Sequence, residues 1–327
     1  MVASMNPAPS MTAPVSGMEP VVHDVARMRI VMVNVYFLGE PGADGWVLVD
    51  AGLGGSAGVI RAAAEQRFGR GTRPRAIVLT HGHFDHVGAL HDLCAAWPEV
   101  PVYAHEMELP YLKGRSPYPP PDPTVGGGMM SRMSKLYPKG PIDLGERVFA
   151  LPTDGTIPGL AQWRVVETPG HSPGHISLFR ESDGVLIAGD AFVTTKQESL
   201  MAVLSQREEL HGPPMYFTCD WDAARESVRK LWELRPRVAA TGHGVPMGGV
   251  RLHEALSQLA QNFDVLARPA HGRYVVEPAV ADRGGVRQVP PPAPDPLPKI
   301  ILGAAAVLLL LGLARRSARN REMNYDS

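Results

Sequence analysis

The segment LTHGHFDHVGAL, residues 79–90, gathers metal-binding side chains at an unusual density. Within six positions it places His81, His83, Asp85 and His86. Imidazole nitrogens and carboxylate oxygens are the ligands that zinc and related divalent ions take in proteins. His81 and His83 are two residues apart and project the same way from an extended chain, whereas Asp85 and His86 follow as the chain turns into a helix. One loop can therefore serve two metal ions.

Two metal centres need more ligands than this loop supplies, so others must come from later segments. Candidates stand where three other apolar runs end: His171 in TPGHSPGH, Asp190 in AGDAF and His243 in TGHG. Clustered imidazoles without a metal would repel one another when protonated and would gain little. The sequence thus predicts a set of seven metal ligands.

Two further polar residues stand near this predicted set. Asp50, in VDAG after an apolar run, is interpreted as a carboxylate that orients a histidine ligand, although an ordinary turn residue fits almost equally well. His175 follows His171 by four residues and is left out of the metal set. It is interpreted either as a contact to a ligand or the substrate, or as a histidine whose hydrogen bonds are satisfied within the core.

The elements that must position these residues alternate between short apolar strands and amphipathic helices. Strands are predicted at 29–38, 46–50, 75–79, 100–104, 163–167 and 237–241, a hairpin with an Asp-Gly turn at 176–190, and helices at 56–68, 86–97, 222–234 and 249–267. Polar clusters recur where the strands end. This pattern predicts a layered α/β architecture with the site along one edge of the sheets.

Composition limits the partners of the chain. Among 327 residues, 32 Lys and Arg balance 33 Asp and Glu, which leaves no net charge to hold a nucleic-acid backbone. A small-molecule substrate is expected instead, and no nucleic acid. Cys94 and Cys219 are far apart and show no CxxC spacing, so a reducing compartment fits best. The oligomeric state is not readable from the sequence.

The chain is expected to divide into one globular domain and several flanking segments. The predicted parts are a disordered leader at 1–20 without signal-peptide features, a globular domain at 21–289 with an insertion or lid at 113–141, a Pro-rich linker at 290–299, a membrane-anchoring helix at 300–314 and a basic tail at 315–327.

The run from Ile300 to Ala314 is apolar on all sides and is followed by four arginines. At about 1.5 Å per residue it would span roughly 22 Å, short of the ~30 Å hydrocarbon core unless flanking cations snorkel. Membrane association through this helix is expected. The arginines favour a cytoplasmic tail, and no export signal precedes the globular domain, so that domain is expected in the cytoplasm.

Aromatic and methionine side chains are concentrated in and around the insertion. They are Tyr111, Tyr118, Met129, Met130, Met133 and Tyr137. Two interpretations stay open: these residues line an apolar pocket for an acyl group, or they only pack the lid onto the domain.

The motif HxHxDH at 81–86, followed in order by His171, Asp190 and His243, resembles the metallo-β-lactamase-fold hydrolases over roughly residues 28–265. The resemblance implies a four-layer αββα sandwich. It further implies that one metal is held by His81, His83 and His171, the other by Asp85, His86 and His243, with Asp190 bridging both and Asp85 and Asp190 as catalytic carboxylates. Two divalent ions are expected, zinc first, with manganese or iron as alternatives.

Two close cations lower the pKa of a shared water, and the resulting hydroxide can attack a carbonyl. The expected reaction is hydrolysis of an ester, thioester or lactone, in a glyoxalase-II-like branch whose subfamily stays open. The PGH turn at residues 169–171 is similar to the one in glyoxalase-II-type enzymes. The helical glutathione-binding region of those enzymes has no match in this sequence. Two alternatives remain: a mononuclear iron oxygenase of persulfide dioxygenase type, and a membrane-tethered binding protein with a structural metal site.

Overall fold

The computed structural model describes residues 17–295. The chain divides into two compact units, residues 1–291 and 292–327, and the boundary falls inside the expected Pro-rich linker. The predicted anchor at 300–314 and the basic tail at 315–327 lie outside the described residues. Within residues 17–295, no helix combines the length and the apolar character that crossing a membrane requires.

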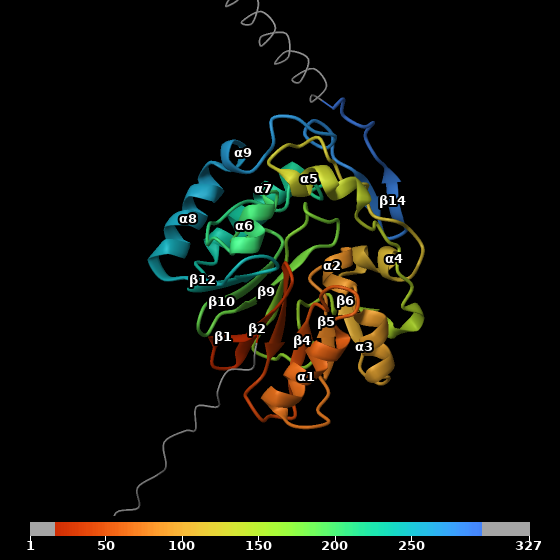
Figure 1. Cartoon of the computed structure of the whole chain (residues 1–327), viewed down its shortest axis with the longest axis vertical. Helices are drawn as coiled ribbons and strands as arrows, with labels where there is room; N and C mark the ends of the chain where they lie inside the picture. The colour runs from red at the N-terminus through yellow and green to blue at the C-terminus, as the bar shows by residue number, and fades with distance from the viewer. Residues whose placement is uncertain (1–16, 296–327) are drawn as a thin grey trace, which may run out of the picture. The chain divides into compact units, whose positions relative to one another are not determined.

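Two mixed sheets form the centre of the first unit (Figure 1). The seven-stranded sheet runs in sequence order through β1 (Met18–Val22), β2 (Val25–Ile30), β3 (Val33–Leu38), β4 (Val47–Val49), β5 (Ala76–Val78), β6 (Val102–Ala104) and β7 (Val148–Ala150). The five-stranded sheet has the order β12 (Met247–Gly248), β11 (Val238–Thr241), β10 (Val185–Gly189), β9 (Ile176–Arg180) and β8 (Arg164–Glu167). A separate hairpin pairs β13 (Val280–Asp282) with β14 (Gly285–Gln288).

Helices connect the strands and cover the sheets. The α-helices are α1 (Ala57–Phe68), α2 (Phe84–Val87), α3 (Leu90–Ala96), α4 (Leu109–Leu112), α5 (Met129–Met133), α6 (Leu200–Ser205), α7 (Trp221–Glu233), α8 (Gly249–Gln261) and α9 (Phe263–Leu266). Short 3-10 turns are η1 (Glu106–Glu108), η2 (Ser134–Leu136) and η3 (Gly145–Arg147).

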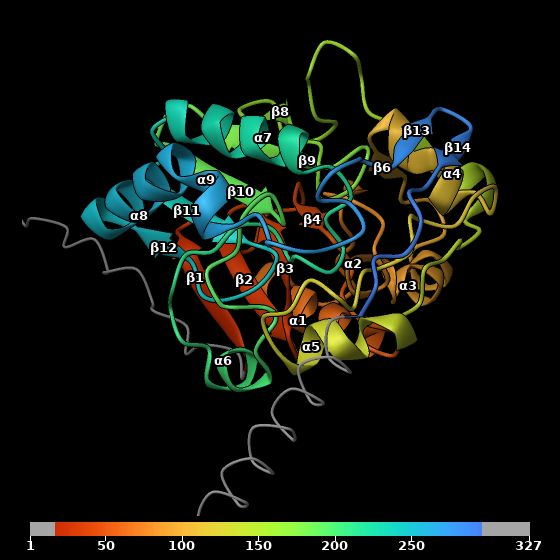
Figure 2. The same ribbon diagram turned by 90° about the horizontal axis from the view of Figure 1, so that it is seen from above.

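Three apolar cores separate the layers. One joins the seven-stranded sheet to α1 and α3, through residues such as Ile60 and Leu93. A second joins the five-stranded sheet to α7 and α8, through Val228 and Leu256. A third contains side chains of both sheets, including Val49. Figure 2 shows α7 and α8 together on one side of the sheets. The sheets therefore pack face to face with helices outside. The alternating pattern predicted the layered α/β class, and the resemblance implied this order of layers.

Several predicted elements differ from the structure. The run 29–38 is not one strand but the end of β2 and all of β3, joined by a two-residue turn at Val31 and Met32. The turn carries no Gly, Asn or Asp to mark it, although Val31 takes a left-handed backbone with φ of 59°. The first strand, β1, begins at Met18, inside the segment predicted as leader.

Helix boundaries also shifted. The predicted helix 86–97 is divided into α2 and α3, because the chain bends between them at Gly88 and Ala89. The predicted helix 249–267 is α8 followed by α9. In contrast, α1 starts directly after Ser56, and α7 starts one residue before its predicted start, with the Asp220 carboxylate accepting from the backbone N–H groups of Asp222 and Ala223. The hairpin of β9 and β10 is confirmed.

Candidate metal centre

All seven predicted ligands meet at one edge of the two sheets. His81, His83, Asp85 and His86 follow β5 and enter α2, His171 lies between β8 and β9, Asp190 follows β10, and His243 follows β11. Every one of the seven is buried, and Asp85 is the most exposed at only 6%. Strands from both sheets end here, so residues separated by up to 162 positions, as His81 and His243 are, come together.

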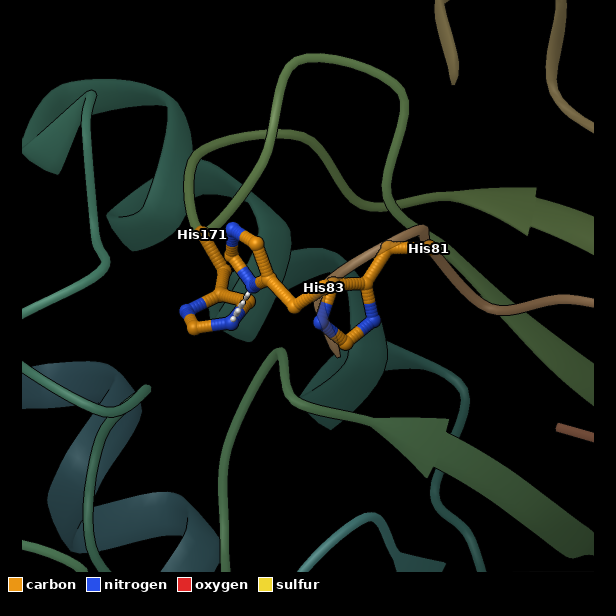
Figure 3. A group of neighbouring side chains, drawn as sticks. All are labelled: His81, His83 and His171. Atoms are coloured by element: carbon orange, nitrogen blue, oxygen red, sulfur yellow. Dashed lines mark hydrogen bonds between the residues drawn. The ribbon is translucent and has the colours of Figure 1, made fainter. Parts of the chain in front are cut away.

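The first subgroup contains His81, His83 and His171, drawn in Figure 3. One ring nitrogen of each lies within 4.8 Å of the others. His83 Nδ1 and His171 Nε2 are 3.0 Å apart. Three imidazole nitrogens this close can hold a single divalent ion.

The second subgroup contains Asp85, His86 and His243, whose candidate ligand atoms also lie within 4.8 Å of one another. His243 Nε2 is 3.5 Å from Asp85 Oδ2. This subgroup adds a carboxylate oxygen to two imidazoles, a donor set that zinc, manganese and iron all accept.

Asp190 lies between the two subgroups. Its Oδ2 atom is 3.5 Å from His86 Nε2, 3.5 Å from His171 Nε2 and 3.1 Å from His243 Nε2. The close approach depends on Gly242, because a Cβ atom there would lie 2.0 Å from Asp190 Oδ1. One carboxylate thus contacts histidines of both subgroups, which is the geometry required of a bridging ligand.

Three buried atoms of the predicted metal ligands have no hydrogen-bond partner within residues 17–295. They are His81 Nε2, His86 Nε2 and Asp190 Oδ1. Buried polar atoms normally find a partner, since an unsatisfied one costs free energy. Two divalent ions would satisfy these atoms, and the His/Asp donor set has the chemistry that such ions prefer. The residues present therefore fit a binuclear centre.

Asp50 contacts a predicted ligand directly. Its Oδ2 atom is 2.8 Å from His86 Nδ1, and it also accepts a hydrogen bond from the hydroxyl of Thr80. The Asp50 Oδ1 atom accepts from the Thr80 backbone N–H. A carboxylate on the far nitrogen of an imidazole fixes the orientation of the ring and leaves the other nitrogen for a metal.

His175 lies behind Asp190 and outside the ligand set. Its Nε2 atom accepts a hydrogen bond from the Asp190 backbone N–H, and its Nδ1 atom is 2.8 Å from the Thr168 hydroxyl. Burial lowers the pKa of His175 to about 4. The ring is therefore neutral, with the Nδ1 proton donated to Thr168, and both nitrogens are used in positioning the Asp190 loop.

The electrostatic environments of the ligand histidines differ. Burial, with the nearby imidazoles adding to it, lowers the pKa of His83 to about 3 and holds the pKa values of His81 and His171 well below the ordinary value. Neutral imidazole is the form that binds a metal, so the first subgroup is ready for it. Burial also opposes charge on His86, but the carboxylates of Asp190 and Asp50 raise its pKa well above the ordinary value.

The insertion and the loop before α7 place aromatic rings beside the centre. Phe217 stacks on the ring of His83 at a centroid distance of 4.4 Å, and the Tyr118 ring lies 4.7 Å from the same histidine on centroids. Tyr111 and Tyr118 stack on each other and are buried, as is Met130. These three side chains therefore pack inside the protein. Met129 and Met133 are exposed instead.

Glu108 is a residue beside the centre that the sequence analysis missed. Its side chain is fully buried, and Oε1 accepts hydrogen bonds from the Ser172 hydroxyl and the Gly174 N–H at 2.8 and 2.7 Å. Its other oxygen, Oε2, accepts from the Gly82 N–H at 3.0 Å and from the Tyr118 hydroxyl. Glu108 thus connects the loop of His81 and His83 to the loop of His171. The sequence offered one indication of Glu108: it lies shortly after the apolar strand that ends in VYA, in a polar cluster like those that contain the predicted ligands.

Fold and site together define an α/β protein with a candidate binuclear metal centre between two sheets. A family model described as the metallo-beta-lactamase superfamily matches residues 28–243. The chain belongs to this superfamily, as the HxHxDH motif predicted.

Similar proteins agree with this assignment. A Bacillus subtilis protein described as a probable metallo-hydrolase, YflN, is 48% identical over 240 residues, which cover 73% of this chain and 90% of that protein. A hydroxyacylglutathione hydrolase of Erwinia tasmaniensis is 32% identical over 144 residues, or 44% of this chain and 41% of that protein. The crystal structure of a beta-lactamase domain protein from Burkholderia ambifaria has a TM-score of 0.51 at 24% identity, over 78% of this chain and 75% of that one. The last likeness shows the fold alone.

Proposed function

We propose that the protein is a metal-dependent hydrolase that cleaves an ester, thioester or lactone of a small molecule. The observation that carries the proposal is the position of Asp190. Its carboxylate contacts histidines of both subgroups, and its Oδ1 atom is buried with no hydrogen-bond partner in the described part of the chain. The hydrolase relatives support the reaction class. Zinc is the metal we propose first, with manganese or iron able to use the same ligands.

In this proposal each side chain has a separate task. His81, His83 and His171 would hold one ion, and Asp85, His86 and His243 the other, with Asp190 between them. When bound, the ions would supply a Lewis acid for the substrate carbonyl and a water of lowered pKa.

The chain itself contributes rigidity and a proton acceptor. Asp50 holds the His86 ring, and His175 holds the backbone of Asp190, so neither ligand has to reorganise during the reaction. Asp85 is the more exposed of the two catalytic carboxylates and is proposed to accept a proton from the attacking water.

The first test is metal analysis of the purified full-length chain together with a panel of ester, thioester and lactone substrates. About two zinc or manganese ions per chain with turnover would support the proposal. A single iron ion without hydrolysis would instead favour the mononuclear iron oxygenase.

Substitution of Asp190 separates a catalytic metal from a structural one. We expect Asp190→Ala to lower turnover by at least about 10³-fold, because both ions lose their shared ligand, while circular dichroism stays close to that of the wild type. The matched control is Asp122→Asn, a buried aspartate whose carboxylate bonds Thr124 and the backbone of Arg273. Loss of the folded signal in Asp190→Ala alone, with no turnover in the wild type, would support the binding-protein alternative.

Association with a membrane through residues 300–314 also stays a proposal, with the hydrolase domain in the cytoplasm. The support is the apolar sequence of that run and the arginines that follow it. Fractionation of cells that express the full-length chain, with protease added from either side of the membrane, tests both statements.

A further inference from the structure

Two short helical segments carry a group of exposed apolar side chains. Such clusters are uncommon on soluble proteins and mark surfaces that bind something. On α5 and the following η2 they are Met129, Met133 and Leu136, and on α6 they are Leu200, Met201 and Leu204. The side chains of Met201 and Leu136 are 75% and 72% exposed, so neither packs into the protein interior. We call these six residues the α5–α6 patch.

The two segments are neighbours in space. The N–H of Met130 donates to the carbonyl of Glu198 at 3.1 Å, and Ser199 is the N-cap of α6. A Cβ atom on Gly128 would lie only 2.2 Å from that same carbonyl, so the backbones are in close contact. Figure 2 shows both helices along the same edge of the molecule. The six side chains therefore belong to one surface.

Unpaired cations border the patch. Segments 126–139 and 199–207 contain no Asp or Glu, but they contain Arg132, Lys135, Lys139 and Arg207, all exposed. Glu208 and Glu209, which follow directly, are paired with Arg251 and Arg207. Within residues 17–295, Arg132, Lys135 and Lys139 form no ion pair. An isologous contact between two copies would bring the same cations face to face, which disfavours a second chain as the occupant. Apolar side chains bordered by cations are typical of proteins that lie on an anionic bilayer.

We propose that the α5–α6 patch docks on the surface of an anionic lipid bilayer, with its apolar side chains in the interface and its cations at the headgroups. The insertion also leads to the metal centre, since Tyr137 packs on Phe84 and Phe217, and Phe217 stacks on His83. Docking would place that centre beside the lipid. From this placement we infer an amphiphilic substrate with an acyl chain, an inference that rests on the proposed hydrolase function. The docking proposal does not depend on that function.

The test uses the full-length chain labelled with an environment-sensitive fluorophore at single introduced cysteines. Met201→Cys and Met133→Cys report on the patch, and Val265→Cys on α9 is the control, because Val265 is 85% exposed and outside the patch. The native Cys94 and Cys219 are buried and free. With vesicles of phosphatidylcholine and phosphatidylglycerol that contain brominated chains, we expect a blue shift and quenching at positions 201 and 133 but not at 265.

Double variants then separate the contribution of the patch to lipid contact from that of the apolar run 300–314, because every variant keeps that run. Met201→Asp with Leu204→Asp should reduce quenching at position 133 by about tenfold with unchanged metal content, whereas Val265→Asp should change nothing. Arg132→Glu with Lys135→Glu should remove the preference for anionic vesicles.

Three outcomes would overturn the docking proposal. One is vesicle-bound protein whose label at 201 does not respond, because the run 300–314 would then make the contact alone. Another is an equal response at all three positions. The third is a signal at 201 that follows protein concentration without lipid, which would mean that a second copy covers the patch. None of these readouts uses turnover, so failure of the hydrolase proposal is distinguishable from failure of the docking proposal.

Discussion

Asp190 and Glu108 are both carboxylates deep in the protein, but their surroundings give them different tasks. Asp190 is surrounded by imidazoles: burial raises its pKa, yet His243 and His86 hold that pKa well below the ordinary value. Among the residues that the structure describes, Glu108 has no cationic partner, and its carboxylate is satisfied by four hydrogen bonds from neutral donors. Its burial raises its pKa, partly offset by those bonds. The role of Glu108 is therefore to hold together the two loops that carry the histidines of the first subgroup.

At the residue scale, Glu108→Ala is expected to lower the free energy of unfolding by about 3 kcal/mol, because it leaves buried donors on Gly82, Ser172 and Gly174 without an acceptor. Metal affinity of the first subgroup should fall by roughly 10- to 100-fold, since its loops lose their connection. Urea denaturation and metal titration measure the two effects.

Asp122→Asn serves as the control for Glu108 as well. It should lower stability without changing metal affinity, because Asp122 contacts neither ligand loop. Glu108→Gln keeps one acceptor oxygen and should fall between the wild type and the alanine variant. Equal metal affinity in Glu108→Ala and the wild type would contradict this account.

At the scale of elements, α7 and the loop of His171 constrain each other. The N–H groups of Cys219 and Asp220, at the start of α7, donate to the carbonyl of Gly170. Gly170 takes φ of 129°, and a Cβ atom there would lie 2.3 Å from the nitrogen of Ala224 in α7. The glycine of the PGH turn is thus required for the close approach of the helix, and that approach places His171.

Gly170→Ala should therefore displace the loop and destabilise the protein by more than about 3 kcal/mol. First-subgroup metal binding is expected to be lost with it. The matched control is Gly58→Ala in α1, where a Cβ atom meets open space and helix propensity should add up to about 1 kcal/mol. Thermal unfolding of the three proteins makes the comparison, and similar midpoints for both variants would contradict the steric argument.

At the scale of the whole described domain, the centre exists only where the two sheets meet. The first sheet supplies His81 to His86, and the second supplies His171, Asp190 and His243. Polar side chains of β2 and β3 bond the backbone around His243. Asn34 Nδ2 donates to the carbonyls of Thr241 and Gly244, and the Tyr36 hydroxyl donates to Thr241 as well.

Asn34→Ala is expected to cost about 2 kcal/mol of stability, because two buried carbonyls each lose one of their two donors and keep only the Tyr36 hydroxyl or Arg27. Affinity of the second metal subgroup should fall, because the segment of His243 is held against β3 by fewer hydrogen bonds. Chemical denaturation and stepwise metal titration check this. Asn262→Ala, which removes only a bond to the Gln258 carbonyl on an exposed helix end, should stay within about 0.5 kcal/mol of the wild type. A comparable loss in both variants would exclude a specific role for Asn34.

The sequence by itself determined the seven candidate ligands and the α/β class, because HxHxDH is local and each later ligand lies within four residues of the end of an apolar strand. The Asp-Gly hairpin and the helix after Ser56 were likewise predictable from local chemistry. The turn at Val31 and Met32 was not, since no turn residue marks it and only the paired register of β2 and β3 fixes it.

Only the tertiary structure decided which side chains support the centre. The contacts of Glu108 with Gly82 and Gly174 join residues 26 and 66 positions apart. Those of Asn34 with Thr241 and Gly244 join residues more than 200 positions apart. Such contacts leave no local pattern in the chain, because they depend on the packing of the two sheets. The exposure of Met201 and Leu136 depends on packing in the same way, since an apolar residue is buried or exposed according to what folds over it.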